Sequence, residues 1–317
     1  MRSKAWLLLF SAGLLLLVEG LARLSFNDIY QESPTEWLLK GNLEQSVIEP
    51  VADEHNFFLS TNEDGLRTDS AFEASTIRLA IIGDSNVLGW GVNDGEDIAS
   101  VMNEISKEQA HNIYVINAGQ PGHSTAQSKR VLCDILPKYR PAHALLFLSM
   151  HDHNQSPRSD LEREGVSLTP YSSLREFLLK HSALYRKIRL IVYPPQNNPA
   201  DQQAETHRVT DEERAYLLDK MQSCMSEWNG TLWLGLLPFV DDLSLPQSSP
   251  ALPRTGAVWA KNWSTNNNTP FVDLRTCCGP DGTELVFTFD EGHLNAKGLN
   301  LVGHALYQHV KTELGLP

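Results

Sequence analysis

Two short segments, far apart in the sequence, contain the residue types of a nucleophilic active site. The segment 83–86 (GDSN) places Ser85 directly after an apolar run, and the segment 290–293 (DEGH) places Asp290 three positions before His293. A serine hydroxyl becomes a nucleophile when a nearby histidine accepts its proton, and a carboxylate can hold that histidine ring in place. Ser85, His293 and Asp290 are therefore our candidates for nucleophile, general base and orienting carboxylate.

Backbone amides near Ser85 are candidates for stabilising negative charge. The serine is expected at the tip of a strand that opens a helix, where helix N-terminal amides surround it. The segment 117–122 (NAGQPG) follows the next apolar run and ends at Gly122. A glycine in such a loop can turn a backbone N–H toward the edge of the sheet. We therefore expect the Ser85 and Gly122 amides to face a developing oxyanion.

Five short runs, almost entirely apolar, are the candidate strands that position these residues. Such runs are typical of strands buried on both faces, as in a parallel sheet covered by helices. The runs are 77–83, 113–119, 143–150, 231–238 and 270–274. Helical periodicity marks 96–109, 125–136, a segment from a Thr210/Glu213 capping box to about 228, and 295–314. The alternation predicts an α/β fold with a doubly wound parallel sheet of five strands. We expect the flavodoxin-like order for these strands.

The third and fourth runs are separated by about 80 residues, far more than one helix and its connections require. This segment contains a helical stretch at 171–193 and a loop rich in Pro, Asn and Gln at 194–206. We interpret about 155–208 as an insertion over the carboxyl edge of the sheet, where ligands bind in such folds. The predicted organisation is an N-terminal segment (1–26), a stalk and lead-in (27–75) and one α/β domain (76–317).

The N-terminal segment has the layout of an export signal. Arg2 and Lys4 precede an unbroken apolar run at 5–18. Cleavage after a small residue and retention as a transmembrane anchor both fit, and we favour the anchor, with Glu19 and Arg23 paired on one helical face. Because the positive end stays inside, both readings place the domain outside the cytoplasm. The anchor predicts a single-pass protein of the inner membrane that faces the periplasm or the cell exterior.

Composition excludes some function classes. The 317 residues include 26 Lys and Arg against 39 Asp and Glu, for a net charge of −13, which disfavours a nucleic-acid partner. With 41% hydrophobic and 21% charged residues, the chain is expected to fold. No C-x-x-C zinc pattern occurs, and we expect no cofactor and no metal.

Four cysteines leave two alternatives open for a compartment that permits disulfides. In one, a bridge joins the vicinal pair Cys277 and Cys278 to Cys133 or Cys224. In the other, Cys133 and Cys224 are small buried apolar residues on helices.

Taken together, the blocks around Ser85, Gly122 and Asp290–His293 resemble the SGNH (GDSL-type) hydrolase family over about residues 77 to 312. The longer run GDSNVLGWGVND (83–94), together with NEDGLRTD (62–69) and HSALYRKIR (181–189), is similar to its membrane-anchored bacterial branch. The resemblance implies a Ser85–His293–Asp290 triad. It also implies an oxyanion hole made of the Ser85 and Gly122 amides and an Asn side chain after the third strand.

The sequence departs from the family at that Asn. The family pattern G-x-N-D appears as 149–152 (SMHD), so His151 occupies the Asn position. A neutral histidine offers an N–H donor only in the correct tautomer. Three alternatives remain: His151 is the donor, Asn154 is the donor, or the site is impaired. A metal at His151 and His153 is not expected, because two ligands are too few.

The expected function is a membrane-anchored, extracytoplasmic serine ester hydrolase or acyltransferase. Its substrate would be a small-molecule or glycan ester, such as an acetyl ester of a carbohydrate or a glycolipid, processed through an acyl-enzyme. The alternative is a catalytically impaired protein of the same fold that binds a glycan or an envelope partner, and His151 is the reason to keep it.

Overall fold

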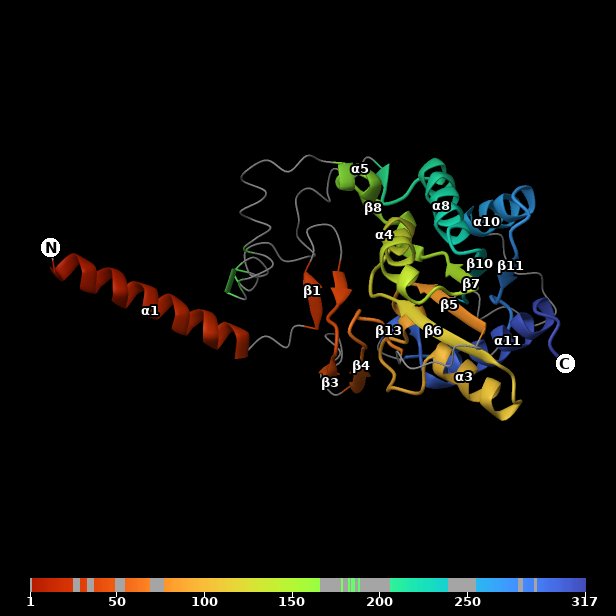
Figure 1. Cartoon of the computed structure of the whole chain (residues 1–317), viewed down its shortest axis with the longest axis horizontal. Coiled ribbons are helices and arrows are strands. Elements are labelled where there is room, and N and C mark those ends of the chain that lie inside the picture. Colours follow the sequence, from red (N-terminus) through yellow and green to blue (C-terminus); the bar gives the residue numbers. More distant parts are fainter. Residues whose placement is uncertain are drawn as a thin grey trace.

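The computed structural model describes most of the chain (Figure 1). The described residues are 2–24, 29–32, 37–48, 55–68, 77–165, 178, 182, 184–185, 188, 206–238, 255–278, 282–287 and 290–317. Within some of these ranges the side chains are not described, and Asp290 is one such residue. The helix predicted at 171–193 and the loop predicted at 194–206 lie almost wholly outside the described residues.

A five-stranded sheet forms the centre of the domain, and every pair of neighbouring strands is parallel. Its order is β11-β10-β7-β5-β6, so the first strand lies between the second and the third. The predicted parallel five-stranded α/β fold and its flavodoxin-like order are therefore confirmed. The strands are β5 (Ile77–Gly83), β6 (Ile113–Gly119), β7 (His143–Phe147), β10 (Thr231–Leu236) and β11 (Phe271–Asp273).

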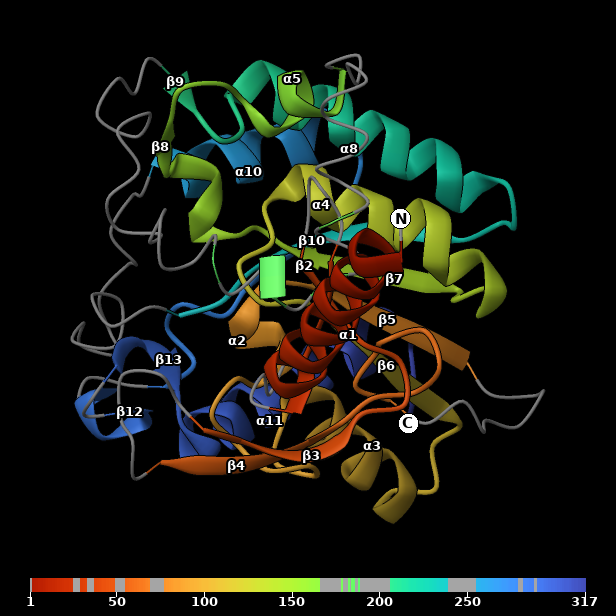
Figure 2. The ribbon, with the colours of Figure 1, turned by 90° about the vertical axis from the view of Figure 1, so that its left-hand side faces the viewer.

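Helices cover both faces of this sheet (Figures 1 and 2). One face carries α3 (Ile98–Glu108) and α11 (Ala296–Glu313), and the other carries α4 (Thr125–Arg130), α8 (Asp211–Ser226) and α10 (Thr255–Asn266). Each face buries its own apolar cluster. The apolar side chains repeat at helical spacing, as in α3, where Ile98, Val101, Met102 and Ile105 are all buried.

Side chains fix where these helices begin. Thr210 and Glu213 form the predicted capping box at the start of α8, and Asn295 accepts a hydrogen bond from the Gly298 amide at 3.1 Å at the start of α11. The helix predicted over 125–136 is interrupted. After α4 the chain forms a π-helical turn, η1 (Val131–Ile135), and then a 3-10 turn, η2 (Leu136–Lys138). Pro137 in η2 has no N–H to continue an α-helical pattern.

The segment before the sheet packs against the domain. Two antiparallel pairs, β1 (Tyr30–Glu32) with β2 (Trp37–Leu39) and β3 (Glu44–Ile48) with β4 (Asn56–Ser60), follow the N-terminal helix α1 (Arg2–Leu24). Their buried apolar side chains form a third cluster that includes Leu88 of the domain. Much of the lead-in is therefore part of the packed structure.

Helix α1 projects from the body of the molecule (Figure 1) and exposes large apolar side chains. They are Phe10, Leu14, Leu15, Leu16, Leu17 and Leu21. Within the described residues, no helix combines the length and apolar character needed to cross a membrane. The transmembrane helix expected at residues 1–26 therefore stays a prediction.

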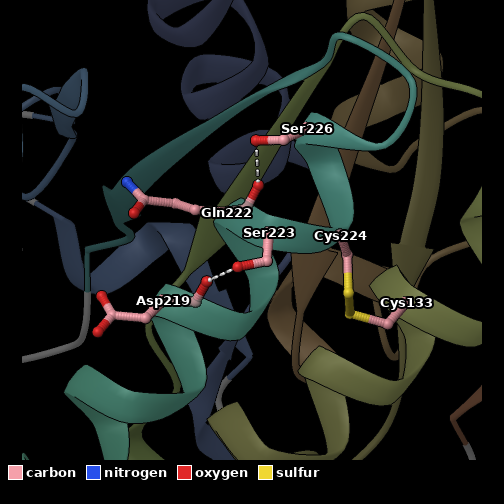
Figure 3. The surroundings of a disulfide bond; sticks show 6 residues. All are labelled: Cys133, Asp219, Gln222, Ser223, Cys224 and Ser226. Atoms are coloured by element: carbon pink, nitrogen blue, oxygen red, sulfur yellow. Dashed lines mark hydrogen bonds between the residues drawn. A yellow bond between two sulfur atoms is a disulfide. The ribbon is translucent and has the colours of Figure 1, made fainter.

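One disulfide, Cys133–Cys224, joins η1 to α8 (Figure 3), with the two Cα atoms 5.6 Å apart. Cys277 and Cys278 are free thiols, with their Sγ atoms 2.9 Å apart. The expected bridge from this vicinal pair to Cys133 or Cys224 is therefore wrong, and so is the alternative of two unbonded buried cysteines. The reason is the layering: Cys133 and Cys224 pack on one face of the sheet, and the vicinal pair packs on the other.

The two ends of the insertion lie side by side. Gln155 and Ser156 form β8, which pairs antiparallel with β9 (Thr206–His207). A short helix, α5 (Asp160–Gly165), follows β8. The chain therefore leaves and re-enters the domain at one place, just after the 3-10 turn η3 (Met150–His153).

Candidate active site

The predicted site residues follow three neighbouring strands. Ser85 follows β5, Gly122 follows β6 and His151 follows β7. Because β5 lies between β6 and β7, these loops meet at one carboxyl edge of the sheet. This is the switch point of a doubly wound fold, where the connections leave to opposite faces. The topology therefore brings together three of the residues that the sequence singled out.

Ser85 and His293 are in direct contact. Ser85 is buried as the first residue of the short helix α2 (Ser85–Leu88), which Asp84 caps by accepting from the Asn86 amide at 3.0 Å. His293 lies in β13 (Asp290–Leu294), and its Nε2 atom is 2.7 Å from the Ser85 Oγ. A histidine nitrogen at this distance is within reach of the serine proton.

Asp290 is the first residue of β13, the strand that carries His293. Its side chain lies outside the described residues, so its orienting role stays a prediction.

Asp84 ties the nucleophile turn to the loop after β7. Its Oδ2 atom accepts a hydrogen bond from Ser149 Oγ at 2.8 Å, and Ser149 Oγ accepts in turn from the His151 amide at 3.0 Å. Asp84 and Ser149 are both buried. This chain of two hydrogen bonds fixes the backbone at His151 relative to the turn that carries Ser85.

The loop 117–122 contains Gly122, which is predicted for the oxyanion hole, and two residues with structural roles. Gly122 has φ +69°, the left-handed region that favours glycine. Asn117 is fully buried, and its side chain donates to the Val87 carbonyl at 3.0 Å and to Asp97 at 2.8 Å. Asn117 therefore joins β6 to the end of α2. A Cβ on Gly119 would lie 2.3 Å from the Leu88 nitrogen, so this close approach requires a glycine.

The hydrogen bonds of His151 define its tautomer. Asn154 donates from Nδ2 to His151 Nδ1 at 3.2 Å, so Nδ1 is the acceptor and the neutral ring carries its proton on Nε2. Burial is the largest factor that lowers the pKa of His151, and the charges of Arg208 and His293 lower it further against the opposing effect of Asp84 and Asp152. His151 thus presents one N–H donor, and the Asn154 amide is directed at its ring.

Asp152 anchors the loop after β7, which also carries His151. It is almost fully buried and accepts from the Thr125 amide and hydroxyl, both at 2.7 Å, and from Arg214 Nε at 2.9 Å. The Arg214 guanidinium also lies over the Trp259 ring, 4.9 Å from its centroid. These contacts hold η3 against α4 and α8.

Several positioning residues were not identified from the sequence. Arg67 comes from the lead-in and donates to the carbonyls of Leu88, Gly89 and Val92 at 3.1, 2.8 and 2.8 Å. It therefore satisfies the carboxyl end of the nucleophile helix. Its only sequence signal was the run 62–69, which suggested a family branch and no contact. The contact of Arg214 with Asp152 carries no local signal, because the two residues are 62 positions apart. The same holds for Arg208 and its distant partners.

Within the part of the chain that the structure describes, no group of three or more His, Cys, Asp or Glu side chains could hold a metal ion. His151 and His153 do not acquire a third ligand there.

No family model matches the chain, and no curated protein matches its sequence. Among solved structures, the psychrotrophic esterase EstA of Pseudoalteromonas sp. is 15% identical, with a TM-score of 0.47 over 75% of this chain and 99% of EstA. An acetyl xylan esterase, AlAXEase, is 16% identical, with a TM-score of 0.46 over 74% of this chain and 100% of its own. The lipase/acylhydrolase of Enterococcus faecalis is 16% identical, with a TM-score of 0.46 over 74% of this chain and 96% of its own. At these identities and TM-scores, the similarity assigns neither an activity nor a substrate to this chain.

Proposed function

We propose that the protein is a serine ester hydrolase or acyltransferase that works through an acyl-enzyme. One observation carries this proposal: His293 Nε2 lies 2.7 Å from Ser85 Oγ at the switch point of the sheet. A serine at the start of a helix and a histidine from a distant strand meet there in the geometry of nucleophile and base.

The chemistry follows from that contact. His293 accepts the Ser85 hydroxyl proton on Nε2 while Oγ bonds to the ester carbonyl carbon. The tetrahedral intermediate then collapses, and the alcohol leaves with the proton returned by His293. Water or an acceptor hydroxyl attacks the acyl-Ser85 ester in the same way, which releases the acid or the transferred ester. Asp290 is proposed to orient the His293 ring.

Three donors are proposed for the oxyanion: the Ser85 amide, the Gly122 amide and the Nε2–H of His151. The tautomer set by Asn154 supports His151 in this role. Asn154 contacts Nδ1, so the proton lies on Nε2, which takes no part in that contact. A neutral ring at physiological pH also follows from the lowered pKa of His151. Among the alternatives left by the sequence, we favour His151 as donor, with Asn154 fixing its ring.

We further propose that the domain works outside the cytoplasm, attached to the inner membrane through its N-terminal helix, as a member of the membrane-anchored SGNH-type branch. The apolar run at 5–18 and the exposed apolar side chains of α1 support the attachment. The Cys133–Cys224 disulfide supports the location, because such bonds persist in oxidising compartments. An acetyl ester of a cell-surface carbohydrate or glycolipid is the proposed substrate class.

The second candidate is an impaired protein of this fold that binds a glycan or an envelope partner. The observation that favours it is the imidazole of His151 where an Asn amide is expected. His151→Asn separates the two functions. In a working enzyme this variant keeps or loses activity, whereas in an impaired protein it raises activity strongly from near zero.

Fluorophosphonate labelling tests the proposed mechanism directly. The wild-type protein should be labelled covalently, Ser85→Ala should not be labelled, and His293→Ala should be labelled far more slowly. Hydrolysis of acetylated sugars should follow the same order. Equal labelling of wild type and Ser85→Ala, or no labelling of wild type, would overturn the proposal.

A further inference from the structure

The residue after the nucleophile holds the strand that carries the base. Asn86 is buried in α2, only 4% exposed, and its side chain makes two hydrogen bonds to β13. Its Nδ2 donates to the Gly292 carbonyl and its Oδ1 accepts from the Leu294 amide, each at 3.1 Å. The two bonds bracket His293, one on each side.

In this arrangement the side-chain amide of Asn86 bonds the backbone of β13 as the backbone of a neighbouring strand would. A carboxamide offers one donor and one acceptor, as a peptide group does. Asn86 can therefore pair with the backbone of β13, and it fixes both peptide units that flank His293. The partners are 206 and 208 residues away in the sequence. The contact sets the distance between two distant parts of the chain, and His293 and Ser85 lie at that junction.

The strand ladder of β13 is short among the described residues. It pairs with β12 (Val286–Phe287), which has only two residues, and the register between them is irregular. A short and irregular ladder defines the position of a strand weakly. The Asn86 amide therefore adds two hydrogen bonds that join β13 directly to the nucleophile helix.

We infer that Asn86 is a positioning residue, which keeps His293 in reach of Ser85 by gripping the backbone on both sides of it. This inference rests on the proposed function. Its physical basis is that a displacement of a catalytic group by about 1 Å can cost about 100-fold in rate.

The chain offers a matched control in Asn103 of α3. Its Nδ2 donates to the Val115 carbonyl at 2.9 Å, and its Oδ1 accepts from the Val115 amide at 2.7 Å. Asn103 thus makes the same pair of bonds between a helix and a strand, but against β6 and away from His293. Asn86→Ala and Asn103→Ala each remove one such pair.

Kinetics at about pH 8.5 on an activated acetyl ester separates positioning from a structural role. Asn86→Ala should lower kcat by about 10- to 100-fold with little change in KM, and Asn103→Ala should leave kcat within about twofold of wild type. In a His293→Ala background, Asn86→Ala should cost almost nothing further, because its effect passes through His293. If Asn86→Ala does not fold, Asn86→Asp replaces it. This variant keeps the shape and the acceptor for the Leu294 amide, loses the donor to Gly292 and should show an intermediate loss of kcat.

Hydrogen exchange supplies a readout that does not depend on activity. Peptides that cover 290–294 should exchange faster in Asn86→Ala than in wild type, and they should be unchanged in Asn103→Ala. Equal kcat in wild type and Asn86→Ala, or equal losses in the Asn86 and Asn103 variants, would overturn the inference. A wild type without esterase activity or labelling would overturn the proposed function, and the exchange comparison would still decide whether Asn86 tethers β13.

Discussion

Arg208 Nη1 donates a hydrogen bond to the carbonyl oxygen of Gly122 at 3.0 Å. The same guanidinium donates to Gln127 at 2.7 Å and to Asp160 at 2.9 Å, so it is held from α4 and from α5. Arg208 directly follows β9, where the insertion returns to the domain. The end of the insertion therefore holds the carbonyl group of the glycine whose amide is proposed for the oxyanion hole.

Replacing Arg208 should impair turnover. Arg208→Gln removes the grip on Gly122 and lets its loop shift, so we expect kcat to fall by about 10- to 100-fold with a smaller change in KM. Steady-state kinetics on an acetyl ester checks this. Arg163→Gln is the control, because Arg163 also lies near Asp160, at 3.9 Å, and bonds Ser156 in the same region. Equal losses in both variants would mean that Arg208 acts only through general stability.

His151 should matter for the transition state more than for substrate binding. His151→Ala removes a proposed oxyanion donor, so kcat should fall by about 10²- to 10³-fold while KM changes little. Asn154→Ala leaves the donor in place but frees the ring, so its effect should be smaller. The two variants can be compared in one kinetic series. A larger loss in Asn154→Ala than in His151→Ala would assign the donor to Asn154 instead.

The sheet was predicted well from the sequence because the residues of each strand form a local, mostly apolar run. Residues 77–83 and 113–119 are almost entirely apolar runs, and β5 and β6 match them residue for residue. The alternation of strands and helices predicted the α/β class, but it does not by itself decide between the doubly wound strand orders. The contact between Ser85 and His293 was expected from the two motifs, but β13, which carries His293, lies outside the five-stranded sheet.

The residues that position the site could not be predicted from the sequence, for a different reason. Arg208 has its role because it bonds Gly122, and Asn86 has its role because it bonds Gly292 and Leu294. These partners are distant in the sequence, so each contact exists only in the folded chain. The cysteine pairing failed in the same way, because only the layering of helices places Cys133 beside Cys224 and keeps both on the opposite face from Cys277.

The disulfide should stabilise the fold without taking part in the chemistry. It joins residues 91 apart, and closing a loop of that length restricts the unfolded chain. The double variant Cys133→Ser/Cys224→Ser should lose about 2–4 kcal/mol in the free energy of unfolding, measured by urea denaturation. Cys277→Ser/Cys278→Ser is the control and should lose much less. Comparable losses in the two variants would contradict the pairing.

Three histidines have a lowered pKa, His143, His151 and His153, and should make the fold sensitive to acid. His143 and His151 are the less exposed of the three. Burial lowers the pKa of His143 and is the largest factor that lowers the pKa of His151. Below about pH 6.5, where free histidine takes up a proton, the unfolded chain binds protons that the folded chain does not. The free energy of unfolding should therefore be at its full value above pH 6.5 and should decrease as the pH falls below it.

Urea denaturation at pH 8 and at pH 5.5 measures this decrease. His143→Gln and His151→Gln should each reduce the difference between the two pH values, and His304→Gln, an exposed position on α11, controls for the loss of an imidazole. A difference that stays the same in all three variants would show that these histidines are not its source.

The nucleophile helix contacts residues that come well before it and far after it in the sequence, and this has a consequence for biosynthesis. Arg67 holds the carboxyl end of α2, whereas the partner of Ser85 lies 208 residues further along. A ribosome releases Ser85 and the first three strands of the parallel sheet, β5 to β7, long before it releases His293. The parallel sheet can therefore assemble while its serine still lacks a base. We expect the Ser85 hydroxyl of the nascent chain to remain unreactive through most of synthesis. It should become a nucleophile only when β13 packs beside α2 and brings His293 to it.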